Sequence, residues 1–382
     1  MIVIKNIEVY APEYKGIQDV LIAGENIEWM DSNIEMNSKK CHIIDGTGKI
    51  LTPGFMDGHV HLIGGGGEGG FRTRAPRVEC YELVENGITT VMGLLGTDGI
   101  TRDVETLLAH AKALHEEGVT TYICTGHYGY PSVTLTGDAK KDVVFIQEVL
   151  GLKLAISDHR APNVTRDELI RIGSDMRIAG MIGGKQGCVI LHMGDDMRGL
   201  KPVFEALEKT SIPTKIFHPT HVNRNPLLLE QGMDFLKMGG YVDYTCGMDD
   251  ERTPGKCILK AKEMGVPTEH ITISSDGHGS WSTYDSEGNL AEIGISPLDC
   301  LYHEFRDMVL NLGMSLEDAL VFFSSNVAKK LDVYPKKGCI CEGSDADVLI
   351  MDKDLNLDTV IARGKIMMQD GEVIVKGAFN SC

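Results

Sequence analysis

Five side chains of the types that bind metal ions stand at the ends of four separate apolar, strand-like runs. They are His59 and His61 in GFMDGHVHL, His192 in CVILHMGD, His221 in TKIFHPTHV and Asp276 in ITISSDG. A strand has a side-chain period of two, so His59 and His61 point to the same side. Burying unpaired polar groups costs about 1–3 kcal/mol each, and packing alone therefore explains the whole set poorly. Imidazole and carboxylate ligands together favour a zinc site.

A lysine within another of these runs, Lys153 in LKLAISD, needs its own explanation. An isolated buried ammonium is costly, and one escape is a depressed pKa that leaves a neutral, nucleophilic amine. Such an amine can capture carbon dioxide and become a carbamate, whose two oxygens can bridge two cations. The residues alone leave a second interpretation open, in which Lys153 extends along apolar surface and keeps its ammonium in water.

The elements that must position these residues are strand-like runs that alternate with helical patterns. The strand candidates are GFMDGHVHL, TTVMGLL, TTYICTG, LKLAISD, CVILHMGD, TKIFHPTHV, GYVDYTC and ITISSDG. Helical patterns such as TRDVETLLAHAKALHEEG, KKDVVFIQEVLG and NPLLLEQGMDFLKMGG follow most of them. Eight such units predict an α/β fold, a (β/α)8 TIM barrel. The metal-type residues would then lie at its C-terminal mouth, where barrel enzymes place their chemistry.

Both ends of the chain read as short strands separated by turns. The first end contains MIVIKNIEVY and DVLIAGENIEWM, and the last contains DADVLIMD, TVIARGKIMMQ and EVIVKG. Because chain ends often meet, we expect one small β-sandwich domain built from both termini. The predicted boundaries are 1–53 for its N-terminal part, 54–335 for the barrel and 336–382 for its C-terminal part.

Composition and charge argue against a nucleic-acid-binding or membrane protein. The chain has 382 residues, a net charge of −18 and no basic stripe, which argues against a nucleic-acid partner. The N-terminal segment lacks the pattern of a signal peptide, and no run approaches the ~20 apolar residues of a membrane helix. We therefore expect a cytoplasmic protein without a membrane partner. The ten cysteines are scattered, and even the close pair Cys339 and Cys341 is expected to be structural and reduced.

The motifs, taken in order, resemble the isoaspartyl (β-aspartyl) dipeptidase family of the amidohydrolase superfamily. The segments that carry the resemblance are PGFMDGHVHL, HLIGGGGEGG, GLLGTD, ISDHR, LHMGD, PTHVNRN and SSDGHGS. The resemblance implies two Zn²⁺ ions per subunit, bridged by carboxylated Lys153. The other implied ligands are His59, His61 and Asp276 for one ion, and His192 and His221 for the second. His218 lies in the same segment as His221, and we prefer His221 because it precedes the matching Asn223-Arg224.

The resemblance also implies substrate contacts at the mouth of the barrel. These contacts are Gly66, Glu68, Thr97, Tyr128, Arg160, Arg224 and Ser280. A β-aspartyl dipeptide, a small acidic substrate, carries one free amine and two free carboxylates. Glu68 suits the ammonium, and the guanidinium groups of Arg160 and Arg224 suit carboxylates. Taken singly, each arginine could equally form a surface ion pair worth about 0–1 kcal/mol.

These groups predict a metallopeptidase that hydrolyses the β-aspartyl amide bond of dipeptides and releases aspartate. Two zinc ions would lower the pKa of a shared water to about 7 and so supply hydroxide. Asp276 would carry the proton to the leaving amine, Tyr128 would donate to the carbonyl oxygen, and Glu68 would hold the substrate. A cyclic-amide hydrolase of the dihydroorotase or hydantoinase type, or a non-catalytic barrel, are the alternatives. The resemblance suggests a homo-oligomer, and neither His218 nor His278 receives a role.

Overall fold

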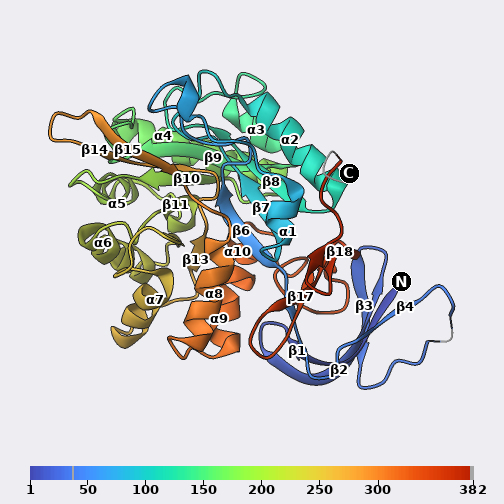
Figure 1. The fold of residues 1–382 in the computed structure, drawn as a ribbon. Helices are drawn as coiled ribbons and strands as arrows, with labels where there is room; N and C mark the ends of the chain where they lie inside the picture. The colour runs from blue at the N-terminus through green and yellow to red at the C-terminus, as the bar shows by residue number, and fades with distance from the viewer. Residues whose placement is uncertain (37, 379–382) are drawn as a thin grey trace.

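The computed structural model describes residues 1–36 and 38–378, and its centre is a ring of parallel strands (Figure 1). The strands are β6 (Phe55–Val60), β7 (Ile88–Gly93), β8 (Thr120–Gly126), β9 (Val149–Ile156), β10 (Cys188–Met193), β11 (Phe217–Thr220), β12 (Val242–Thr245) and β13 (Ile271–Ser274). They match the eight apolar runs. Strands β6 to β11 form one parallel sheet, β12 pairs with β13, β11 contacts β12, and β13 contacts β6. The expected α/β, TIM-barrel-like architecture is confirmed.

Helices follow the strands and cover the outside of the ring (Figure 1). They are α1 (Cys80–Val84), α2 (Val104–Glu117), α3 (Ala139–Phe145), α4 (Arg166–Gly183), α5 (Lys201–Glu208), α6 (Pro226–Lys237), α7 (Pro254–Glu263), α8 (Cys300–Leu310), α9 (Leu316–Phe323) and α10 (Ser325–Lys330), with short 3₁₀ turns at Phe71–Thr73 and Thr214–Ile216. Side-chain caps begin several of them; Asp103 accepts from Thr106 N at α2. The predicted helix KKDVVFIQEVLG ends earlier than expected, because its last residues begin β9.

Strands from both ends of the chain form one hydrogen-bonded sheet. They are β1 (Ile2–Tyr10), β2 (Tyr14–Ala23), β3 (Asn26–Asp31), β4 (His42–Asp45), β5 (Ile50–Pro53), β16 (Val348–Met351), β17 (Leu357–Ala362), β18 (Lys365–Gln369) and β19 (Glu372–Val373). The two ends join where β5 pairs antiparallel with β16, so that Thr52 lies opposite Leu349. The division of this sheet into two sandwich layers stays a prediction, as do the boundaries 1–53, 54–335 and 336–382.

One hairpin was not expected from the sequence. After β13 the chain forms β14 (Ser280–Tyr284) and β15 (Leu290–Ile295), an antiparallel pair that extends away from the barrel (Figure 1). Because β14 begins at Ser280, this hairpin stands beside the C-terminal mouth.

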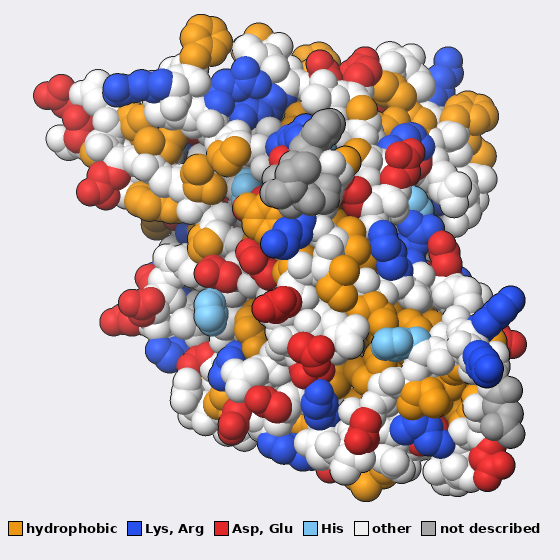
Figure 2. Space-filling model, turned by 45° about the vertical axis from the view of Figure 1, so that its right-hand side comes forward, with side chains coloured by type: hydrophobic (Ala, Val, Ile, Leu, Met, Phe, Trp, Pro, Cys, Tyr) orange, Lys and Arg blue, Asp and Glu red, His pale blue; other side chains and the backbone are white. Residues whose placement is uncertain are grey.

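The surface carries mixed charge. Figure 2 shows one face on which Lys and Arg side chains alternate with Asp and Glu side chains, and they form no continuous basic stripe over the described residues of that face. No helix within the described ranges is long and apolar enough to cross a bilayer. A homo-oligomer and a cytoplasmic location stay predictions.

Candidate active site

The five metal-type residues lie where the strands end. His59 is in β6, His61 is just beyond it, and His192 is the second-last residue of β10. His221 directly follows β11, and Asp276 comes two residues after β13. Both of these residues have left-handed backbone angles, with φ of 64° and 55°. Such conformations are uncommon outside glycine and concentrate at functional sites.

These five side chains meet at one centre. Ligand atoms of His59, His221 and Asp276 all lie within 4.8 Å of one another. Asp276 Oδ1 lies 3.4 Å from His59 Nε2 and 3.3 Å from His61 Nε2. The ring centroid of His221 lies 4.7 Å from that of His192 and 5.1 Å from that of His59. The fold therefore brings together residues that are far apart in the sequence.

The chemistry of this centre fits a bound cation. His59 Nδ1, His61 Nδ1, His221 Nε2 and Asp276 Oδ1 are buried and have no hydrogen-bond partner among the described residues. Burial lowers the pKa of the His59 and His221 imidazoles well below the usual value, so these rings are neutral. Neutral imidazole is the form that binds metal ions, and each unpaired buried group would otherwise cost about 1–3 kcal/mol. The donor set is suited to a metal ion.

Lys153 lies inside this centre. Its side chain is fully buried, and its Nζ lies 2.9 Å from His59 Nε2. The interpretation in which Lys153 extends to solvent is therefore wrong. Burial lowers the pKa of Lys153 to about 7, which makes the neutral amine available near physiological pH.

A carboxylate that the sequence reasoning missed orients His192. Asp158 Oδ2 lies 3.0 Å from His192 Nε2, and the Tyr128 hydroxyl lies 2.6 Å from His192 Nδ1. Burial alone would raise the pKa of Asp158, but its bonds to His192 and Arg160 hold the pKa well below the usual range. With Nε2–H donating to Asp158, the lone pair of His192 lies on Nδ1, where it accepts from the Tyr128 hydroxyl in this structure. A histidine held by a carboxylate through its other nitrogen is the usual arrangement around a metal ion. The only sign of Asp158 in the sequence is its place in ISDHR, close to the end of a predicted strand.

Four of the expected substrate contacts form a second cluster around Glu68. Glu68 Oε1 accepts from Ser280 Oγ at 2.8 Å, Thr97 Oγ1 at 3.2 Å and Arg160 Nη1 at 3.2 Å. Glu68 Oε2 is buried and has no partner within the described part of the chain. Because Arg160 also bonds Asp158, which bonds His192, this cluster is linked directly to the metal-type residues.

Arg224 lines a cavity together with two members of the Glu68 cluster, Arg160 and Ser280. The cavity has a volume of about 360 Å³, and Arg160, Arg224, His192, Asp276 and Ser280 all line it. Trp281 and Met248 line the same cavity. It is therefore bounded by metal-type residues, two arginines and apolar side chains.

Gly66 lies in a neighbouring cavity of about 360 Å³, which Glu68 and Thr97 also line. The φ of Gly66 is +80°, and a Cβ there would lie 2.3 Å from the carbonyl oxygen of Thr73. Only glycine fits at this position without strain, so the loop that carries Glu68 can pass close to the backbone of Thr73.

The two histidines without a predicted role lie outside the ligand cluster. His218 Nε2 lies 3.3 Å from Thr272 Oγ1, below the centre, and this placement agrees with the choice of His221. His278 lies 3.2 Å from Glu82 Oε1 and 3.0 Å from the Pro76 carbonyl oxygen. It therefore ties the segment after β13 to α1 and to the loop before it.

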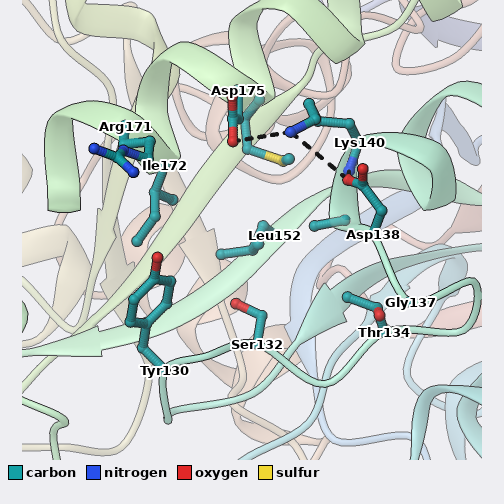
Figure 3. Close-up of a pocket in the computed structure, with 12 residues that line it drawn as sticks. Tyr130, Ser132, Thr134, Gly137, Asp138, Lys140, Leu152, Arg171, Ile172 and Asp175 are labelled. Carbon is teal, nitrogen blue, oxygen red and sulfur yellow. Dashed lines mark hydrogen bonds and ion pairs between the residues drawn. The ribbon is translucent and has the colours of Figure 1, made fainter.

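A separate pocket of about 160 Å³ lies outside the barrel mouth (Figure 3). Tyr130, Arg171 and Lys140 line it, and Lys140 pairs with Asp175 at 3.2 Å. None of the predicted site residues lines this pocket. We assign it no chemistry.

A sequence profile described as "Amidohydrolase family" matches residues 50–367. The chain belongs to the amidohydrolase family. The crystal structure of a β-aspartyl dipeptidase from Fervidobacterium islandicum AW-1, in complex with β-Asp-Leu dipeptide, is 40% identical, covers 97% of both chains and has a TM-score of 0.93. Imidazolonepropionase from Shouchella clausii (strain KSM-K16) is 23% identical over 94% of this chain and 85% of that relative.

A D-hydantoinase from Thermus sp. is 17% identical, covers 99% of this chain and 98% of its own, and has a TM-score of 0.70. This likeness shows the fold alone. Family membership makes this amidohydrolase a hydrolytic enzyme, and it sets aside the non-catalytic barrel.

Proposed function

We propose that this amidohydrolase is a β-aspartyl dipeptidase, which hydrolyses the side-chain amide bond of a β-aspartyl dipeptide and releases aspartate. The observation that carries the proposal is the Glu68 cluster beside the metal-type residues. Together with Arg224, which lines the same cavity as Arg160, it offers one acidic oxygen and two arginines to a substrate that has one ammonium and two carboxylates. The β-Asp-Leu dipeptide bound by the Fervidobacterium enzyme has this pattern of charges.

Two Zn²⁺ ions per subunit are part of the proposal. His59, His61 and Asp276 would hold one ion, and His192 and His221 would hold the other. Lys153 would bridge them as a carbamate, and its burial and pKa of about 7 support this role. When bound, zinc lowers the pKa of water toward ~7 and so supplies a nucleophile at neutral pH.

Two protein groups would act on the reacting amide. The Asp276 carboxylate, held between His59 and His61, can take a proton from the attacking water and pass it to the leaving amine. Burial raises the pKa of the Tyr128 hydroxyl far above its usual value, so it remains protonated. In this structure the hydroxyl donates to His192 Nδ1. With that lone pair taken by a metal ion, it could donate instead to the carbonyl oxygen as negative charge develops there.

The remaining contacts would select the substrate. Glu68 Oε2 is free to accept the substrate ammonium, because Oε1 holds all three of the protein donors. Burial would lower the pKa of Arg160, but its bonds to Asp158 raise it, so its charge is permanent. Arg160 and Arg224 would each donate to one substrate carboxylate. A cyclic amide has no free ammonium and would leave Glu68 without a ligand.

The direct test compares turnover of β-Asp-Leu with that of dihydroorotate and hydantoin, using the zinc-loaded enzyme. We expect hydrolysis of β-Asp-Leu with release of aspartate, measured by chromatography. Hydrolysis of either cyclic amide in the absence of β-Asp-Leu hydrolysis would overturn the proposal in favour of the cyclic-amide alternative.

A further inference from the structure

The barrel has two seams, between β11 and β12 and between β13 and β6, where the described strands share no continuous backbone ladder. A backbone bond of 3.1 Å from Val222 N to Asp243 O crosses the first seam. A bond of 2.9 Å from His61 N to Gly277 O crosses the second. At both seams, buried side chains supply further bonds.

At the first seam, the side chain of Asn223 makes hydrogen bonds that a neighbouring strand's backbone would otherwise make. Its fully buried amide donates from Nδ2 to Thr245 O at 2.9 Å and accepts at Oδ1 from Thr245 N at 2.9 Å. The hydroxyl of the same Thr245 lies 2.9 Å from His221 Nδ1. Asn223 thus holds the residue that orients His221.

Asp57 has the corresponding place at the second seam. Its carboxylate is 1% exposed and accepts from His59 N at 3.1 Å and from Ser275 N at 3.3 Å. It also accepts from the Ser275 hydroxyl, which in turn accepts from Gly277 N at 2.8 Å. One carboxylate therefore binds the backbone of His59 to the residue that precedes Asp276.

We propose that Asn223 and Asp57 are positioning residues that set the spacing of the metal ligands across the two seams. The inference rests on the proposed metal centre. Each side chain bonds to backbone across a seam within two residues of a ligand, where the strands have no continuous backbone ladder. Losing either would let the seam widen at the ligands. Losing an outer partner of a metal ligand typically lowers metal affinity by about 10- to 100-fold.

The test pairs each seam variant with a control that has the same chemistry elsewhere. Asp57→Ala is compared with Asp19→Ala, because Asp19 is 1% exposed and accepts from Asn6 N and Ile34 N, both at 2.8 Å, in the terminal sheet. Asn223→Ala is compared with Asn326→Ala, because the buried amide of Asn326 donates to Ile271 O at 2.9 Å, at the opposite end of β13 from Asp276.

Zinc affinity is measured by competition with a chromogenic chelator, and Tm is measured with zinc bound and after chelation. All four variants should lower Tm. Only the two seam variants should weaken zinc binding, by about 10- to 100-fold. If Asp57→Ala does not fold, Ser275→Ala removes the hydroxyl link alone and should still weaken zinc binding.

Wild-type zinc affinity in the seam variants, alongside a fall in Tm like that of the controls, would show a purely structural role and overturn the inference. Equal loss of zinc in the control variants would overturn it as well. A wild-type protein that binds no zinc would instead refute the metal centre of the proposed function, and the inference with it.

Discussion

Replacing Glu68 with glutamine tests substrate recognition most directly. Glu68→Gln keeps the size of the side chain and keeps Oε1 as an acceptor for Ser280, Thr97 and Arg160. It places an NH₂ group where Oε2 now lies buried without a partner in the described residues. The cluster should therefore persist, while the group that would accept the substrate ammonium becomes a donor.

The expected loss follows from one charge-assisted hydrogen bond. Such a bond contributes about 1.5–3 kcal/mol, which corresponds to a fall of about 10- to 150-fold in kcat/KM for β-Asp-Leu. N-succinyl-leucine is the matched substrate, because it has the same amide and carboxylates but lacks the amine. The wild type should prefer β-Asp-Leu over N-succinyl-leucine, and Glu68→Gln should lose most of that preference.

Steady-state kinetics on both substrates gives the result, with Glu148→Gln as the control. Glu148 pairs with Lys112, away from the mouth, and its variant should keep the wild-type preference. If Glu68→Gln retained the full preference for β-Asp-Leu, the ammonium would bind elsewhere and the reasoning from the Glu68 cluster would be wrong.

Three further variants test the metal centre and Arg224. Lys153→Ala should lose metal and activity, with partial rescue by short carboxylic acids, as followed by metal analysis and turnover. Because the Lys153 pKa is about 7, its amine is neutral above that pH, and reactivation of the metal-free enzyme by bicarbonate and zinc should become faster as pH rises through this value. Asp276→Asn should lower kcat by orders of magnitude while metal analysis still detects metal, and near-normal kcat would exclude the proton shuttle. Arg224→Met should raise KM for β-Asp-Leu; unchanged kinetics would place Arg224 outside the site.

The barrel strands could be predicted because parallel strands buried on both faces are almost wholly apolar. Strand β10, with all six residues buried, is an example. The β14–β15 hairpin could not be predicted in this way, since all of its strand residues are exposed or half-buried and neither strand is an apolar run. The helix predicted for KKDVVFIQEVLG was too long at its C-terminal end. Its last residues, VLG, continue the apolar helical pattern but form the start of β9.

Some residues of the candidate site could also be predicted from the sequence, and others could not. Ligand types could be recognised because each polar group interrupts an apolar run at a strand end, as His192 does in β10. Asp57, Asp158 and Asn223 were not assigned roles, because their importance lies in which distant backbone or ring they contact. The bond between Arg160 and Glu68 spans 92 positions in the sequence, and no local pattern encodes it.

Asp158 joins the two halves of the candidate site. Its carboxylate accepts from Arg160 Nε at 2.9 Å and from Arg160 Nη2 at 3.0 Å, and it lies 3.0 Å from His192 Nε2. The same group therefore fixes the lone pair of a proposed zinc ligand and the plane of a proposed carboxylate-binding arginine. Because both depend on one buried carboxylate, the metal ligand and the substrate contact cannot shift independently. Asp158 would therefore fix the distance between the substrate carboxylate bound at Arg160 and the reacting amide at the metal centre.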